Sequence, residues 1–229
     1  MNDSEAMDSI LQDSDAYVAH GCAYGHMGNL DQAIACFNKA IELDPQNAAA
    51  YYNRGLTYGR RGDQNQEIAD YTEAIHLDPH FAFAYYNRGN LYAGMGDMDQ
   101  AIADYSKAIE LDPQDAGTYT NRGSAYYTKG DLNQAIADYS KATELNPQLV
   151  VAYRNRSRAY HDKGDLDQAI AGYNQVIELA PEDASVYYSR GNVWIAKGDL
   201  DRALADYTEA IRRNPEHAAA YNNRGNVYE

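Results

Sequence analysis

The chain has 229 residues, a formal net charge of −15 and 45% hydrophobic residues. This charge argues against non-specific binding to nucleic acid and against docking on an anionic membrane surface. No apolar run approaches the length that spans a bilayer, and the acidic N-terminus lacks the apolar core of a secretory signal, so we expect a cytoplasmic protein. The two cysteines, Cys22 and Cys36, have no zinc-type spacing, and we expect them to be reduced.

A spacing of 34 residues organises the sequence. A Tyr-Tyr-Asn-Arg-Gly block begins at Tyr51 and Tyr85 and returns in looser form at four later sites, and all six prolines recur at the same spacing. We therefore divide the chain into an acidic N-terminal segment (1–13), expected to be disordered or a short capping helix, six full repeats, and the first helix of a seventh repeat (218–229). The full repeats are 14–47, 48–81, 82–115, 116–149, 150–183 and 184–217.

Each repeat, numbered here from position 1 to position 34, predicts two helices. Position 15 is glycine in all six repeats, which suits a helix end in the left-handed conformation. Position 16 is Asp or Asn, and position 19 is Gln in every full repeat but the sixth, which is the spacing of a capping box. The proline at position 32 ends the second helix. Helix A therefore covers positions 1–14, and helix B covers positions 16–30.

The faces of these helices follow from a turn of about 100° per residue. Positions 4, 7, 8 and 11 of helix A, which are mostly Tyr, Arg, Gly and Tyr, share one face that packs against the apolar stripe of helix B. A single hairpin cannot bury such a stripe, so neighbouring hairpins must stack. Positions 2, 5, 6, 9, 12 and 13 lie on the opposite face of helix A, where we expect ligand-binding residues.

This pattern resembles the tetratricopeptide repeat (TPR) family. The third repeat carries all seven of the residues typical of that family: Tyr85, Gly89, Tyr92, Ala101, Tyr105, Ala108 and Pro113. The departures elsewhere are Glu67 at position 20, Ser157 at position 8, Val176 at position 27 and Trp194 at position 11. The resemblance implies an all-α fold, a right-handed α-solenoid superhelix of helix-turn-helix hairpins. It also implies a non-catalytic scaffold that binds an extended peptide or a partner protein in a concave groove lined by helix A.

Arginine at position 7 lies in the packed stripe and needs a buried partner. The aspartates at position 23 of helix B provide one, either within the repeat or from the preceding repeat. Pairing within the repeat matches Arg54, Arg88, Arg122 and Arg190. It leaves Arg156 unmatched, because Gly172 stands at position 23 of its repeat. We therefore expect these arginines to form internal ion pairs.

Asparagine at position 6 is the main candidate for ligand binding: Asn53, Asn87, Asn121, Asn155 and Asn223. An amide offers donors and an acceptor, so a ladder of amides could bind a peptide backbone of any sequence, at about 0.5–1.5 kcal/mol for each hydrogen bond. Asn90 and Asn192 at position 9 join the same face. The alternative is that the asparagines are soluble groove residues inherited through repeat duplication.

Two regions of this face differ in character. Tyr52, Phe83 and Tyr86, next to Phe81, predict an aromatic patch for an apolar or proline-rich anchor. Further along the chain, Tyr127, Arg154, Arg158 and His161 predict a locally basic region that binds an acidic group. The alternative for both regions is drift at solvated positions.

The sequence contains no catalytic motif, no phosphate-binding loop and no His, Cys and carboxylate cluster at metal-ligand spacing. It therefore predicts a protein that is not an enzyme, with no cofactor and no metal, whose partners are proteins or peptides. Two alternatives remain open. The chain could be a TPR arm or fragment of a larger regulatory protein or enzyme, or it could self-associate weakly through its repeat ends.

Overall fold

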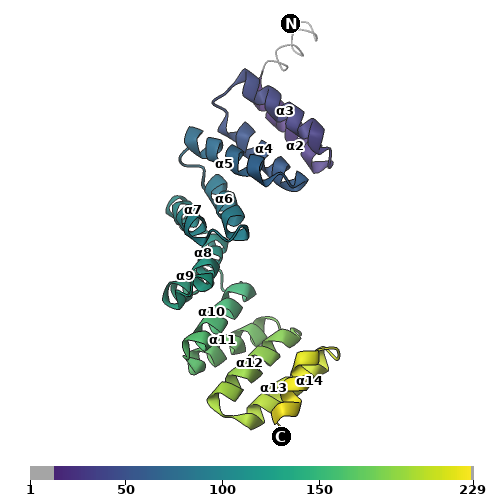
Figure 1. Cartoon of the computed structure of the whole chain (residues 1–229), viewed down its shortest axis with the longest axis vertical. Helices are drawn as coiled ribbons and strands as arrows, with labels where there is room; N and C mark the ends of the chain where they lie inside the picture. Colours follow the sequence, from purple (N-terminus) through teal and green to yellow (C-terminus); the bar gives the residue numbers. More distant parts are fainter. Residues whose placement is uncertain (1–12, 228–229) are drawn as a thin grey trace. The chain divides into compact units, whose positions relative to one another are not determined.

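The computed structural model describes residues 13–227, and its regular structure is entirely α-helical, as predicted (Figure 1). The helices are α2 (Ser14–His26), α3 (Leu30–Leu43), α4 (Ala48–Arg61), α5 (Gln64–Leu77), α6 (Ala82–Gly94), α7 (Met98–Leu111), α8 (Ala116–Thr128), α9 (Leu132–Leu145), α10 (Val150–Lys163), α11 (Leu166–Leu179), α12 (Ala184–Lys197), α13 (Leu200–Arg213) and α14 (Ala218–Val227). Except for Asp13, the predicted N-terminal segment lies outside the described residues.

The chain divides into two compact units, with the boundary between Pro113 and Gln114. Unit 1 holds α2 to α7, and unit 2 holds α8 to α14. Within a unit, each helix A packs on the helix B that follows it, as α6 does on α7, and each helix B contacts the next helix A, as α5 does α6. This consecutive packing of hairpins confirms the predicted α-solenoid class.

The predicted turn glycines all have the left-handed conformation, with φ between 80° and 90°. The capping prediction is only partly correct. Asp97, Asp131 and Asp199 accept a hydrogen bond from the backbone N–H three residues later, at 3.1–3.2 Å. The equivalent residues of three other repeats, Asn29, Asp63 and Asp165, cap their helices with no side-chain hydrogen bond.

The glycine at position 8 lets the aromatic ring at position 24 lie directly against helix A. A Cβ on Gly89 would lie 2.9 Å from Cε1 of Tyr105, and one on Gly191 would lie 2.7 Å from Cε1 of Tyr207. Tyr105 and Tyr207 are buried as a result. Where position 8 is glycine, the missing side chain on helix A therefore matches a large ring on helix B.

Four of the position-7 arginines form the ion pairs that the sequence predicted within a repeat. Nε and Nη2 of Arg88 donate to the two carboxylate oxygens of Asp104, both at 2.8 Å, while Nη1 donates to Oγ1 of Thr72 in the preceding repeat at 3.0 Å. The guanidinium also lies 5.9 Å from the ring centre of Tyr85. Equivalent ion pairs join Arg54 to Asp70, Arg122 to Asp138, and Arg190 to Asp206.

One arm of such an arginine therefore reaches its own hairpin and another reaches the hairpin before it. The sequence predicted the first contact but not the second, which uses the small polar residue at position 25. A buried ion pair is weak evidence for stability by itself, and its best-attested role is to specify register. The arginines thus favour one register between neighbouring hairpins.

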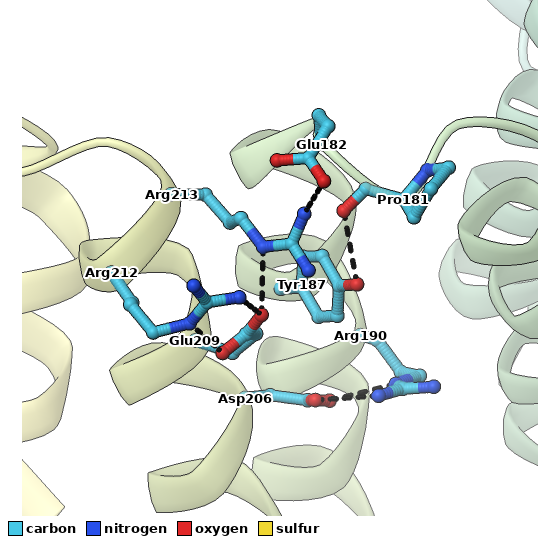
Figure 2. Close-up of polar contacts among 8 residues, drawn as sticks. All are labelled: Pro181, Glu182, Tyr187, Arg190, Asp206, Glu209, Arg212 and Arg213. Atoms are coloured by element: carbon cyan, nitrogen blue, oxygen red, sulfur yellow. Dashed lines mark hydrogen bonds and ion pairs between the residues drawn. The ribbon is translucent and has the colours of Figure 1, made fainter.

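The sixth repeat has a further cluster of ion pairs around Arg213, here called the Arg213 lock and shown in Figure 2. Arg213 stands where the five earlier repeats have leucine, yet its side chain is only 14% exposed. It forms ion pairs with Glu182 in the preceding turn and with Glu209 one helical turn earlier, and its guanidinium lies 5.7 Å from the ring centre of Tyr187. The lock ties α13 to the turn before α12.

No helix within the described part of the chain combines the length and the apolar character needed to cross a membrane.

Candidate functional site

Two pockets lie between neighbouring A helices, one in each unit. The α2–α4 pocket in unit 1 has a volume of about 270 Å³, and the α8–α10 pocket in unit 2 has a volume of about 300 Å³. Both are lined by positions 9, 12, 13 and 24 of one repeat and by positions 6 and 9 of the next. In this order the residues are Ser124, Tyr127, Thr128, Tyr139, Asn155 and Arg158 in unit 2, and Cys22, Gly25, His26, Phe37, Asn53 and Leu56 in unit 1.

The α8–α10 pocket is polar. The Tyr139 hydroxyl donates to Oγ of Ser124 at 3.1 Å, and the side-chain amide of Asn155 has no hydrogen bond within residues 13–227. The Tyr127 hydroxyl donates to the carboxylate of Asp162. Burial, reinforced by that carboxylate, raises the pKa of Tyr127 to about 12, so the hydroxyl keeps its proton at neutral pH.

The two arginines predicted to form a basic region each lie beside a carboxylate. Arg154 forms an ion pair with Asp183, the residue that caps α12. Arg158 lies 5.0 Å from the ring centre of Tyr127, and its Nε is 4.0 Å from Oδ2 of Asp162. Each arginine of the predicted basic region is therefore close to a carboxylate of the chain, and binding of an acidic group there stays a prediction. Only Arg158 lines the pocket, with a side chain that is 67% exposed.

The α2–α4 pocket has a more apolar character. Its wall includes the side chain of Leu56 and the buried ring of Phe37, which lies directly against Gly21. The Cys22 thiol donates to Oδ1 of Asn53 at 3.5 Å, and burial raises the pKa of that thiol. The thiol is therefore a neutral wall residue at neutral pH.

The asparagines of the predicted ladder differ in their surroundings: some line a pocket, and others form hydrogen bonds between neighbouring helices. Nδ2 of Asn53 donates to the carbonyl of Ala49 at 2.8 Å, and Nδ2 of Asn87 donates to the Tyr52 hydroxyl at 3.0 Å. Nδ2 of Asn223 donates to Oδ1 of Asn192 at 3.0 Å and to the Tyr188 hydroxyl at 3.3 Å. The amides of Asn87 and Asn223 therefore join neighbouring A helices, whereas the amide of Asn53 donates within its own helix.

The other members of the ladder lie on the same helical face. Asn121 is half-buried on α8. Asn90 accepts a hydrogen bond from the Tyr105 hydroxyl at 2.8 Å. Within residues 13–227, Asn155 is thus the ladder residue that combines an unbonded amide with a place in a pocket.

The tyrosines at position 5 lie closer to helix B than predicted. The ring of Tyr52 is 5.7 Å from that of Tyr71 and 4.7 Å from that of Phe81, and the ring of Tyr86 is 6.2 Å from that of Tyr105. Position 5 is about 110° from the centre of the packed stripe, so it lies on the flank of helix A rather than opposite the stripe. Both tyrosines are half-buried.

Phe83 is the most exposed residue of the predicted aromatic patch, at 67%. It follows Phe81 by two residues at the start of α6. The patch therefore consists of one exposed ring next to rings that form part of the hairpin core.

Sequence reasoning missed the pocket walls at position 24. It assigned Tyr139 to the core, and the ring is indeed buried, but its edge also lines the α8–α10 pocket. It also gave no role to Ser124, Thr128 or Cys22, although positions 9 and 13 were on the predicted face. Comparing the sizes of residues at positions 9 and 12 among the repeats could have found them.

No group of three or more His, Cys, Asp or Glu side chains in the described part of the chain could hold a metal ion.

Family models match most of the sequence. Tetratricopeptide repeat models match residues 48–81, 82–115 and 116–149, and a TPR repeat model matches residues 21–62, 157–195 and 191–229. The chain therefore belongs to the tetratricopeptide repeat family. A search of curated protein sequences found no match.

Solved structures give the same result. The chain is similar to YrrB, described as a TPR protein with an unusual peptide-binding site, with 25% identity and a TM-score of 0.75 over 82% of this chain and 97% of YrrB. It is similar to MamA with 28% identity and a TM-score of 0.69, over 75% of this chain and 94% of MamA. A TPR protein from Cytophaga hutchinsonii shares the fold, with 19% identity, a TM-score of 0.79, and coverage of 95% and 92%.

Proposed function

We propose that this protein is a non-catalytic scaffold that binds an extended segment of a partner protein along the face formed by its A helices. The observation that carries the proposal is the recurrence of a pocket at one repeat register in both units, each bordered by the asparagine at position 6. Pockets that recur at a fixed register suit an extended peptide, whose side chains also recur at a fixed spacing.

The chemistry of the two pockets supports different side chains. The α2–α4 pocket, with Phe37 and Leu56 in its wall, suits an apolar side chain. The α8–α10 pocket, with Asn155 and Arg158, suits a group rich in hydrogen-bond acceptors. Membership of a family of interaction scaffolds, and the similarity to YrrB, favour a peptide ligand over a small metabolite.

Peptide selection from a random displayed library tests the proposal. Selected peptides should bind the whole chain, and replacing both pocket asparagines, Asn53→Ala with Asn155→Ala, should weaken binding about tenfold through the loss of hydrogen bonds in both pockets. The matched control replaces Asn65 and Asn133, which are exposed on B helices. If no peptide can be selected, or if both double variants bind as the wild type does, the proposal fails.

A further inference from the structure

The residue at position 9 decides what lies between neighbouring A helices in unit 2. Between α12 and α14 that residue is Asn192, and its Oδ1 accepts from the Tyr207 hydroxyl at 2.8 Å and from Nδ2 of Asn223 at 3.0 Å. The Asn192 amide thus bridges the two A helices. The same hydrogen bond uses a donor of Asn223, the position-6 asparagine, that could otherwise bind a ligand.

Between α8 and α10 the same position holds Ser124, whose side chain is too short to form that bridge. Its Oγ is directed inward, where it donates to the carbonyl of Thr120 at 3.0 Å and accepts from the Tyr139 hydroxyl at 3.1 Å. The facing amide of Asn155 has no hydrogen bond within residues 13–227, and a pocket of about 300 Å³ lies in front of it. The tyrosine at position 24 makes the same contact in both places. The two sites differ at position 9 and at position 5, where Tyr188 accepts a second hydrogen bond from Asn223 at 3.3 Å and the α8 repeat has Thr120.

We propose that Ser124 keeps this pocket open and that the pocket takes the carboxylate of an acidic side chain of the bound peptide. Two donors converge on the pocket, the amide of Asn155 and the guanidinium of Arg158. A hydrogen bond in which the donor or the acceptor is ionised is about twice as strong as one between neutral groups. The inference rests on the proposed function, because the carboxylate belongs to the peptide ligand.

The neighbouring Asp162 limits the affinity. Its carboxylate accepts from the Tyr127 hydroxyl and lies 4.0 Å from Nε of Arg158. A ligand carboxylate therefore shares the guanidinium with Asp162, and an isolated acidic residue should bind with a dissociation constant on the order of millimolar. Arg154 adds nothing to this site because Asp183 already pairs with it.

Nuclear magnetic resonance of the side-chain amides tests the inference directly. The probe is N-acetyl-glutamate N-methylamide, and its control is the glutamine compound of the same shape at the same ionic strength. We expect saturable shifts of the Asn155 NH₂ signals, identified by their loss in Asn155→Ala, with the glutamate compound alone. Equal shifts with both compounds, or no shift with either, would overturn the assignment of a carboxylate.

The variant Ser124→Asn should close the pocket by building the bridge seen between α12 and α14. Binding of the glutamate compound should fall about tenfold or more, and the Asn155 amide protons should exchange more slowly with water. Ser106→Asn is the matched control, because Asn38 and Asn174 stand at the same repeat position. Unchanged binding in Ser124→Asn would contradict the role of Ser124.

Arg158→Gln keeps the inference testable if Ser124→Asn folds poorly. It should abolish the preference for glutamate over glutamine, and a preserved preference would overturn the proposal. The outcome is separable from that of the proposed function. If library peptides bind without an acidic residue, only the carboxylate site is contradicted. If the chain binds the glutamate compound but no peptide, only the scaffold role is contradicted.

Discussion

Ser157 and Gly172 face each other across the α10–α11 hairpin so closely that a Cβ on Gly172 would collide with Oγ of Ser157. In repeats with the usual pattern, glycine stands at position 8 and aspartate at position 23, as in Gly123 and Asp138. Repeat 5 therefore exchanges the two, with the side chain on helix A and the glycine on helix B. Two departures that look independent in the sequence are one compensated change.

The exchange also redirects the arginine of repeat 5. Without an aspartate in its own hairpin, Arg156 donates from Nη1 to Oγ1 of Thr143 at 3.0 Å and to Oγ of Ser140 at 3.4 Å, both in the preceding helix B. Helix α10 is therefore tied by this side chain to α9 rather than to α11.

The first prediction concerns this pair. Gly172→Asp alone should lower the free energy of unfolding by about 1–3 kcal/mol, because its side chain meets Ser157 in a packed hairpin. Adding Ser157→Gly should recover most of that loss, since Arg156 can then form the ion pair of the other repeats. Urea unfolding of the wild type, the two single variants and the double variant measures the coupling. Additive effects would contradict a compensated exchange.

The second prediction concerns the buried ion pairs. Arg88→Ala leaves the carboxylate of Asp104 buried without its partner, so the free energy of unfolding should fall by about 3 kcal/mol. Arg224 provides the control, because the one side-chain hydrogen bond described for it is a 3.4 Å contact with Thr208. Arg224→Ala should change stability much less, and equal losses in the two variants would show that the carboxylate is unimportant.

The third prediction concerns Glu67, which replaces the usual alanine at position 20. It fits because Gly59 on the facing helix has no side chain, and its Oε1 accepts from the Tyr71 hydroxyl at 3.1 Å. Burial raises the pKa of Glu67, so the folded chain holds the proton more tightly than the unfolded chain does. The ionised carboxylate therefore reduces stability once the pH rises above the unfolded value, about 4.3.

Glu67→Gln keeps an acceptor for Tyr71 without the charge. It should be more stable than the wild type at neutral pH, and the difference should disappear as the pH falls below about 4. Thermal melts across that pH range measure it, with Glu73→Gln on the same helix as the control. A variant that is less stable than the wild type at neutral pH would show that the charge of Glu67 is favourable.

Much of the fold follows from the repeat period, because glycine, proline and the apolar positions each recur in step with it. The places of Tyr127 and Asn155 beside a pocket are predicted well, since both lie within a regular helix and helical periodicity gives their direction. The surroundings of Tyr52 and Arg154 are predicted poorly. Tyr52 lies on the flank of its helix, where a neighbouring ring decides its environment, and the partner of Arg154 comes from the residue before α12, whose path periodicity does not describe.

The last prediction concerns Arg213, the arginine that replaces a leucine of the repeat pattern. Its ion pairs with Glu182 and Glu209 hold a charged side chain in a largely buried place (Figure 2). Only the arginine is largely buried, because Glu182 is 86% exposed, and replacing a charge that is held away from water by an apolar residue of similar size is often neutral or stabilising. Arg213→Leu should therefore melt at the same temperature as the wild type or higher, and its melting temperature should depend less on salt.

Lowering the pH should increase the difference in stability between Arg213→Leu and the wild type. The hydrogen bonds from Arg212 and Arg213 lower the pKa of Glu209 to about 2, so Glu209 contributes stability above its unfolded pKa, and that contribution is lost as the pH falls toward 2. Arg213→Leu lacks one of the two arginines that pair with Glu209, so it should lose less stability than the wild type as the pH falls. Arg212→Leu is the matched control, because the Arg212 side chain is 62% exposed and Glu209 keeps Arg213. If Arg213→Leu melts well below Arg212→Leu, the lock stabilises the sixth repeat more than leucine would, and its replacement of the leucine is favourable in itself.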